Sequence, residues 1–186
     1  MLAYFFCHWK LPTVSEAEYE ERLRDFHDAL RTAPSDGFSA SWSVALAQVP
    51  WANNGGESYE DWYFIRNSAD LDPLSDAAIS ASRKMPHDKA AAALAGGSAG
   101  LYRPRLGEVS GVPRFTAWFD KPEGWSYQQL FDRLGPSMQQ GAVLWQRQMA
   151  LGPAREFCLH TNTSVTLPDG INAQAISLKR VFPGSV

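Results

Sequence analysis

The sequence predicts an α+β fold in which a strand–helix–strand–strand–helix–strand order of elements occurs twice along 186 residues. Hydrophobic runs switch between strand and helix periodicity in that order in each half. A serine-based capping signal opens a helix at a corresponding place in both halves, and a proline follows the first strand of each. These observations predict one pseudo-symmetric domain, made of a first unit (1–106), a linker (107–113) and a second unit (114–186).

The first half begins with a strand and a helix. Residues 3–9 are rich in aromatic side chains and predict a buried strand that ends at Lys10-Leu11-Pro12. Ser15, followed three residues later by Glu18, forms a capping box that predicts a helix start. The apolar side chains on one stripe of this helix are Tyr19, Leu23, Phe26 and Leu30. The segment 34–37 contains Pro34 and Gly37 and is expected to end the helix.

Two strands and an interrupted helix complete the first half. Residues 38–48 and 60–66 predict antiparallel strands, joined by a turn over 49–58 that contains Asn53-Asn54-Gly55-Gly56. The alanine-rich stretch 72–95 favours a helix, which Pro86 is expected to interrupt. Residues 100–106 predict an edge strand, because Pro104 cannot donate to a central ladder.

The second half repeats the order with a reduced second helix. Strands are predicted over 115–119, 141–149, 155–161 and 173–182. Ser126 and Gln129 form a second capping box, which begins the helix between the first two of these strands. The stretch 163–172 leaves room for one helical turn at most. The whole chain is therefore expected to contain eight strands and two continuous helices, with a broken helix in the first half.

Composition excludes several classes of protein. The chain has 17 basic and 20 acidic residues, a net charge of −3, which argues against a nucleic-acid partner. No apolar run approaches the roughly 18 residues that span a bilayer, and no signal-peptide pattern precedes His8. We therefore expect a cytoplasmic protein with no membrane partner. Cys7 and Cys158 lie in apolar strands and are expected to be buried, reduced thiols.

The order of elements in each half is that of the ferredoxin-like unit. Two such units in one chain resemble the dimeric α+β barrel superfamily in a tandem-duplicated form. The resemblance is one of topology and covers almost the whole chain. It implies antiparallel sheets packed face to face, with helices outside. The superfamily includes cofactor-independent monooxygenases, isomerising and haem-dependent enzymes and stress-response proteins, so that fold restricts function only weakly.

Aromatic and histidine residues supply the candidate site. The chain contains 7 Trp, 6 Tyr and 10 Phe, which we expect to fill the space between the sheets and to line any cavity there. Candidate ligand-binding residues are Trp42, Trp118, Trp145 and Arg147, the last for an anionic group. His8 and His160 lie on predicted central strands, where each is either a structural histidine or a proton acceptor. His27, at the edge of a helix stripe, and His87, expected to be solvated, are interpreted as structural.

Two functional hypotheses remain. The chain has no Gly-x-Ser-x-Gly elbow, phosphate-binding loop or metal-ligand spacing, and we predict no metal and no cofactor. The first hypothesis is a protein that binds or transforms a small hydrophobic or aromatic molecule between its sheets, in the manner of a cofactor-independent monooxygenase. The alternative is a non-catalytic protein with a solid core that binds a partner through residues 51–56 or 96–106. Either would be a monomeric pseudo-dimer or a homodimer.

Overall fold

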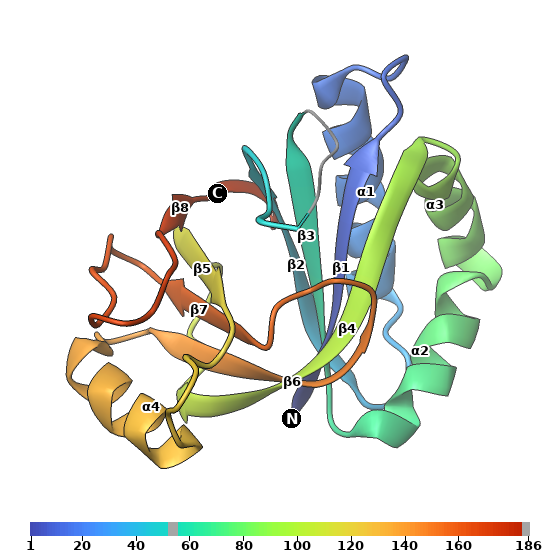
Figure 1. The fold of residues 1–186 in the computed structure, drawn as a ribbon. Coiled ribbons are helices and arrows are strands. Elements are labelled where there is room, and N and C mark those ends of the chain that lie inside the picture. Colours follow the sequence, from blue (N-terminus) through green and yellow to red (C-terminus); the bar gives the residue numbers. More distant parts are fainter. Residues whose placement is uncertain (52–55, 184–186) are drawn as a thin grey trace.

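In the computed structural model, which describes residues 1–51 and 56–183, one antiparallel sheet curls until it nearly closes (Figure 1). The strand order is β8-β5-β7-β6-β4-β1-β3-β2-β9, and the helices lie outside the curled sheet. The elements are β1 (Leu2–Lys10), α1 (Glu16–Thr32), β2 (Phe38–Leu46), β3 (Ser58–Ile65), α2 (Leu71–Ala78), α3 (Ala81–Ala91), β4 (Leu94–Gly107), β5 (Phe115–Phe119), α4 (Tyr127–Leu134), β6 (Val143–Leu151), β7 (Phe157–Thr161), β8 (Ile176–Ser177) and β9 (Lys179–Phe182). None of the helices in the described ranges is long and apolar enough to span a bilayer.

Strand β4 corrects one expectation. It was predicted to be an edge strand, but it lies between β1 and β6 and joins the two halves into one sheet. It pairs with β1 as far as Tyr102 and with β6 from Ala99 onward. Pro104 therefore lies where the pairing with β1 has ended, next to a register shift in the pairing with β6. The missing N–H is tolerated there because only one neighbouring strand remains.

The broken helix is divided at a different residue than expected. Helix α2 ends at Ala78 and α3 begins at Ala81, whose φ of 50° is incompatible with a continuous right-handed helix. Pro86 lies inside α3 rather than at the break. A proline removes one backbone hydrogen bond, and the rest of this helix persists around it.

The end of the chain holds the two edges of the sheet together. The single strand expected over 173–182 is instead two short strands that pair with different partners. Ser177 of β8 pairs with Phe115, whereas Lys179 of β9 pairs with Ala45 of β2. One residue separates Ser177 from Lys179 along the chain. Strands β8 and β9, which stand at opposite ends of the strand order, are therefore adjacent in the sequence. This arrangement explains why the sheet nearly closes.

The alternation of side chains along the strands creates separate cores on the two faces of the sheet. On β1, Ala3, Phe5 and Cys7 face the interior, while Tyr4 and Phe6 belong to the layer beneath the helices. A second outer layer includes Leu130 and Leu134 of α4. Both cysteines are buried and free, as expected.

Gly37, between α1 and β2, should not tolerate a side chain. Its φ is 77°, and a Cβ atom there would lie 2.2 Å from Asp70 Cγ. We expect Gly37→Ala to lower the free energy of unfolding by at least about 1 kcal/mol, the usual cost of left-handed backbone for an L-residue. Urea denaturation measures this. Gly135→Ala is the matched control, because Gly135 has open space around it and no positive φ; equal losses in both variants would contradict the explanation.

Candidate functional site

Most of the side chains proposed from sequence converge inside the curled sheet. Trp42 from β2, Trp118 from β5 and Trp145 from β6 surround Trp62 of β3, with ring-centroid distances of 6.5, 6.1 and 5.2 Å to it. His160 of β7 lies 4.6 Å from the Trp62 ring. We call these five residues, together with Glu60, the interior cluster.

Glu60 is the polar centre of the interior cluster. Its carboxylate is fully buried and accepts hydrogen bonds from Trp118 Nε1 at 2.7 Å and from Trp62 Nε1 at 3.3 Å. Trp145 Nε1 donates to His160 Nδ1 at 3.1 Å. Since an indole nitrogen can only donate, the neutral imidazole of His160 carries its proton on Nε2, 3.9 Å from Glu60 Oε2. Three indole nitrogens of the cluster are paired in this way, whereas Trp42 Nε1 and His160 Nε2 are buried without a hydrogen-bond partner among the described residues.

Of two other sequence-based candidates, Arg147 lies away from the interior cluster and Trp51 packs against it. Arg147 is half-buried, and its guanidinium donates to the carbonyl oxygen of Ala154 between β6 and β7. The described contacts do not bring it to the tryptophans. In the loop proposed as a partner surface, residues 52–55 lie outside the described ranges. Trp51 is half-buried and packs edge-on against Trp118 at 4.8 Å.

His8 lies on the opposite face of the sheet from His160. Its Nδ1 is 2.6 Å from the hydroxyl oxygen of Tyr19, and its Nε2 is 3.1 Å from Asp61 Oδ2. His27 Nε2 lies 3.3 Å from the other oxygen of the same carboxylate. The Tyr63 hydroxyl donates to Asp61 Oδ2 at 3.0 Å. We call these residues, with Ser41, the Asp61 cluster.

The Nε2 atoms of His8 and His27 lie within ion-pair distance of the Asp61 carboxylate but do not meet the geometry of a hydrogen bond to it. A carboxylate only accepts, so a neutral imidazole that faces it keeps its proton on Nε2. In neutral His8, Nδ1 then holds a lone pair that accepts the hydroxyl proton of Tyr19. The resulting chain runs from a phenol through an imidazole to a carboxylate, the order in which a proton is passed in general base catalysis.

Burial and neighbouring charges shift the pKa values of the carboxylate and the phenols in opposite directions. Burial alone would raise the pKa of Asp61, but the two imidazoles hold it well below its usual value of 3.8. Burial, and secondarily the negative charge of Asp61, raise the pKa of Tyr19 and of Tyr63 well above 10. Asp61 is therefore ionised and both phenols are neutral at physiological pH.

A cavity of about 530 Å³ lies between the outer face of the sheet and helices α1–α3. This volume is within the usual range for small-molecule sites. Side chains of the Asp61 cluster form part of its wall: Tyr19, His8, Asp61 and Tyr63. Most of the remaining wall is apolar. The polar residues contributed by α2 and α3 are Asp72, Ser75 and His87. This cavity lies beneath the helices, whereas the sequence-based hypothesis placed a ligand between the sheets.

Comparisons with known proteins agree with this architecture. The chain matches no protein-family model and no curated protein. It is similar to the solved structure of an anthrone oxidase-like protein, with a TM-score of 0.55 and 12% identity over 97% of this chain and 93% of that one. It is also similar to a putative monooxygenase from Lactobacillus acidophilus, with a TM-score of 0.55 and 10% identity over 97% and 94%. The chain folds as an α+β barrel.

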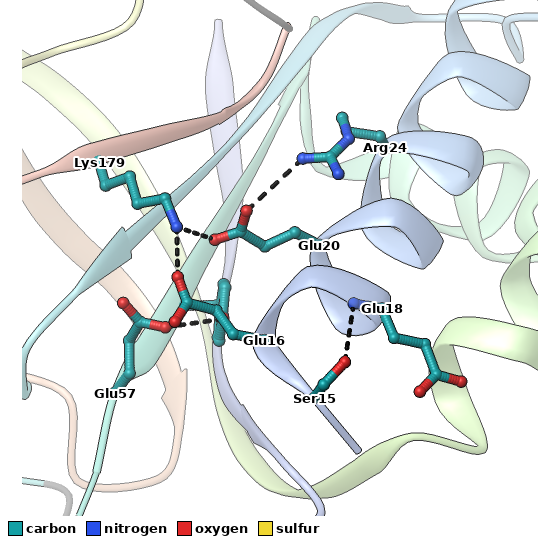
Figure 2. Close-up of polar contacts among 8 residues, drawn as sticks. Ser15, Glu16, Glu18, Glu20, Arg24, Glu57 and Lys179 are labelled. Carbon is teal, nitrogen blue, oxygen red and sulfur yellow. Dashed lines mark hydrogen bonds and ion pairs between the residues drawn. The ribbon is translucent and has the colours of Figure 1, made fainter.

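An acidic group on the outside of this barrel is matched by a lysine. Oxygen atoms of Glu16, Glu20 and Glu57 lie within 4.8 Å of one another. Figure 2 shows the ammonium group of Lys179 bonded to both Glu16 and Glu20, with Arg24 paired to Glu20 on its other side. The distance between Arg24 and Glu20 is 3.6 Å. Through Lys179 this group joins α1 to β9.

The residues that sequence reasoning missed are Asp61, Tyr19, Tyr63 and the role of His27. His27 was placed at the edge of the helix stripe, but it is fully buried against Asp61. One signal was present in the sequence. Glu60 and Asp61 are adjacent acids in the middle of a strongly apolar strand, and buried carboxylates of this kind require partners on both faces of the sheet.

Proposed function

We propose that the protein is an enzyme that removes a proton from an apolar, aromatic substrate held in the cavity between the barrel and helices α1–α3. The observation that carries this proposal is the Tyr19–His8–Asp61 chain in the wall of that cavity. The apolar lining suits a flat ring system, and the chain supplies a localised proton acceptor. The names of the two similar structures agree with oxygen chemistry on such a substrate.

Tyr19 would accept the substrate proton at its hydroxyl oxygen while its own proton moves to His8 Nδ1. The imidazolium formed in this way faces the Asp61 carboxylate, 3.1 Å from Nε2. Because Asp61 is ionised before the reaction, it stabilises this charge without moving a proton of its own. Tyr19 and His8 are the proton-accepting residues, and Asp61 positions and stabilises His8.

The substrate carbanion would then react with dioxygen. One electron pair of the carbanion forms a bond to oxygen, and protonation gives a hydroperoxide. Loss of water from that hydroperoxide leaves a carbonyl, so a CH₂ group and O₂ become C=O and H₂O. The oxidant is dioxygen, and the reaction as written needs no cofactor.

Anthrone provides a direct test of the proposal. The wild-type protein is expected to consume oxygen with anthrone and to form anthraquinone, measured with an oxygen electrode and by absorbance. Tyr19→Phe should lower the rate by about 100-fold, the lower range for loss of a proton-transfer group. Tyr127→Phe is the control, because it removes an exposed hydroxyl on α4 that bonds to Glu156.

Two outcomes would count against the proposal. A Tyr19→Phe variant with the wild-type rate would show that this hydroxyl accepts no proton. If the protein neither consumes oxygen nor shows a thermal shift with a panel of hydroxylated polycyclic aromatics, the cavity is not a site for this substrate class.

We also propose that the chain consists of two fused ferredoxin-like units, 1–106 and 114–186, connected by 107–113. The strand order supports this, because β4-β1-β3-β2 and β8-β5-β7-β6 place the strands of each half in the same arrangement. In the second half the described residues between β7 and β8 form no helix. A fused pair buries its own sheets, so light scattering should give a monomer or a dimer; an obligate tetramer would contradict this.

A further inference from the structure

The carboxylate of Asp61 contacts a second imidazole that the proposed proton transfer does not use. His27 Nε2 lies 3.3 Å from Asp61 Oδ1, and His27 Nδ1 lies 2.8 Å from the hydroxyl oxygen of Ser41. In each imidazole, therefore, Nε2 lies close to one oxygen of the carboxylate and Nδ1 lies close to a hydroxyl group. We call Tyr19–His8 the inner limb and Ser41–His27 the outer limb.

The two limbs end in different surroundings. Tyr19 is buried and forms part of the cavity wall. Ser41 lies on β2 and is partly exposed. His27 is fully buried and stacks between the rings of Tyr63 and Phe182, at 5.1 and 5.2 Å, outside the cavity lining. The outer limb therefore lies outside the cavity lining, and it ends at a residue that is partly exposed to solvent.

Charge balance couples the two limbs. Asp61 supplies one negative charge, which compensates one buried imidazolium; a second imidazolium beside it would be uncompensated. Other titratable or charged groups lie near the cluster. The tyrosines among them, Tyr4, Tyr19, Tyr59 and Tyr63, are neutral phenols. Arg31 lies over the Phe182 ring, His87 contacts Phe26, and Asp72 of α2 lines the same cavity.

We propose that His8 and His27 share a single imidazolium charge on Asp61, so that a proton taken up by His8 from the cavity expels a proton from His27 to solvent through Ser41. In this proposal the charge before the reaction lies on His27, whose Nδ1–H then donates to Ser41 Oγ. When His8 Nδ1 receives the proton of Tyr19, His27 gives its Nδ1 proton to water by way of Ser41. One proton enters, one leaves, and no proton crosses the carboxylate.

This scheme rests on the proposed function only for the source of the incoming proton. In this proposal His27 and Ser41 return the cluster to its original charge without opening the cavity to water. A purely structural pair of residues would not do this. His27 is a positioning residue in this sense, since it acts on the reaction through Asp61.

Imidazole ¹⁵N NMR on the labelled protein, without any substrate, tests the shared charge. The wild-type spectrum at neutral pH should show His27 as imidazolium and His8 as the neutral Nε2–H tautomer. In His27→Gln the imidazolium signature should move to His8, and in Asp61→Asn neither ring should carry it. The His160 and His87 resonances serve as internal controls and should not change.

If His27→Gln fails to fold, the same NMR measurement on Ser41→Ala tests the proposal. Loss of the acceptor on Nδ1 should shift the charge from His27 toward His8. Two imidazolium rings, two neutral rings in the wild-type protein, or a His8 spectrum unaltered in both variants would overturn the proposal. These NMR outcomes are independent of the anthrone assay, so the failure of one proposal is distinguishable from the failure of the other.

Discussion

Asp61→Asn should slow the proposed oxygen consumption with anthrone by at least about 100-fold, because the imidazolium of His8 would lose the charge that stabilises it. The same change should lower the free energy of unfolding by about 3 kcal/mol, since it breaks a buried carboxylate–imidazole group. Oxygen-electrode rates and urea denaturation measure the two effects.

The stability of Asp61→Asn should also respond differently to acid. The folded-state pKa of Asp61 lies below its usual value of 3.8, so the carboxylate stabilises the wild-type fold above that pH. This contribution declines as the pH falls below about 4. The wild-type protein should therefore lose stability in that range more steeply than the asparagine variant.

Asp132→Asn is the matched control for Asp61. Asp132 lies exposed on α4, where it accepts a hydrogen bond from Gln128. Its replacement should alter the free energy of unfolding by no more than about 0.5 kcal/mol, as is usual for surface positions. A fully active Asp61→Asn protein, or one with the wild-type acid profile, would refute the assignment of Asp61 as an ionised partner of His8.

Trp62→Ala is expected to cause the largest loss of stability in the barrel interior. Trp62 is fully buried, and its ring contacts Trp42, Trp118, Trp145 and His160. The truncation would leave a cavity and remove a hydrogen bond to the buried Glu60 carboxylate. We expect a loss of about 4 kcal/mol in the free energy of unfolding, typical of large aromatic truncations in a core.

Trp125→Ala tests whether position, rather than the loss of any tryptophan, determines this effect. Trp125 is half-buried before α4, with the Arg133 guanidinium 4.3 Å from its ring centroid. Its loss should cost about 1 kcal/mol. If the two variants unfold at the same urea concentration, the barrel interior is not the main source of stability that its packing indicates.

Most individual elements could be predicted from local sequence. The capping signals at Ser15 and Ser126 correctly marked the starts of α1 and α4, where each serine accepts from the backbone N–H three residues later. Those signals depend on neighbouring residues only. The division of the last segment into β8 and β9 could not be predicted, because it depends on pairing with β5 and β2, which are distant in sequence.

In the candidate site, too, some features could be predicted from local sequence and others depended on contacts between distant segments. The aromatic content predicted large rings between the sheets without deciding whether they fill that space, and Trp42, Trp118, Trp145 and His160 meet there. His8 lies on the other face of the sheet, where it contacts Tyr19 and Asp61. A strand pattern that is apolar at every position does not indicate which set of alternate side chains faces inward. The location of the cavity under the helices therefore could not be predicted.

The sequence by itself determined the order of the elements up to the last strand, the starts of two helices and the abundance of rings in the barrel, because these depend on local hydrogen bonds and composition. Only the tertiary structure decided that Asp61, His8, His27 and Tyr19 meet beside a cavity. The residues come from β3, β1 and α1, and their distances depend on strand register and helix packing. Asp61 can remain ionised in a buried position because that register places two imidazoles and a phenol around one carboxylate.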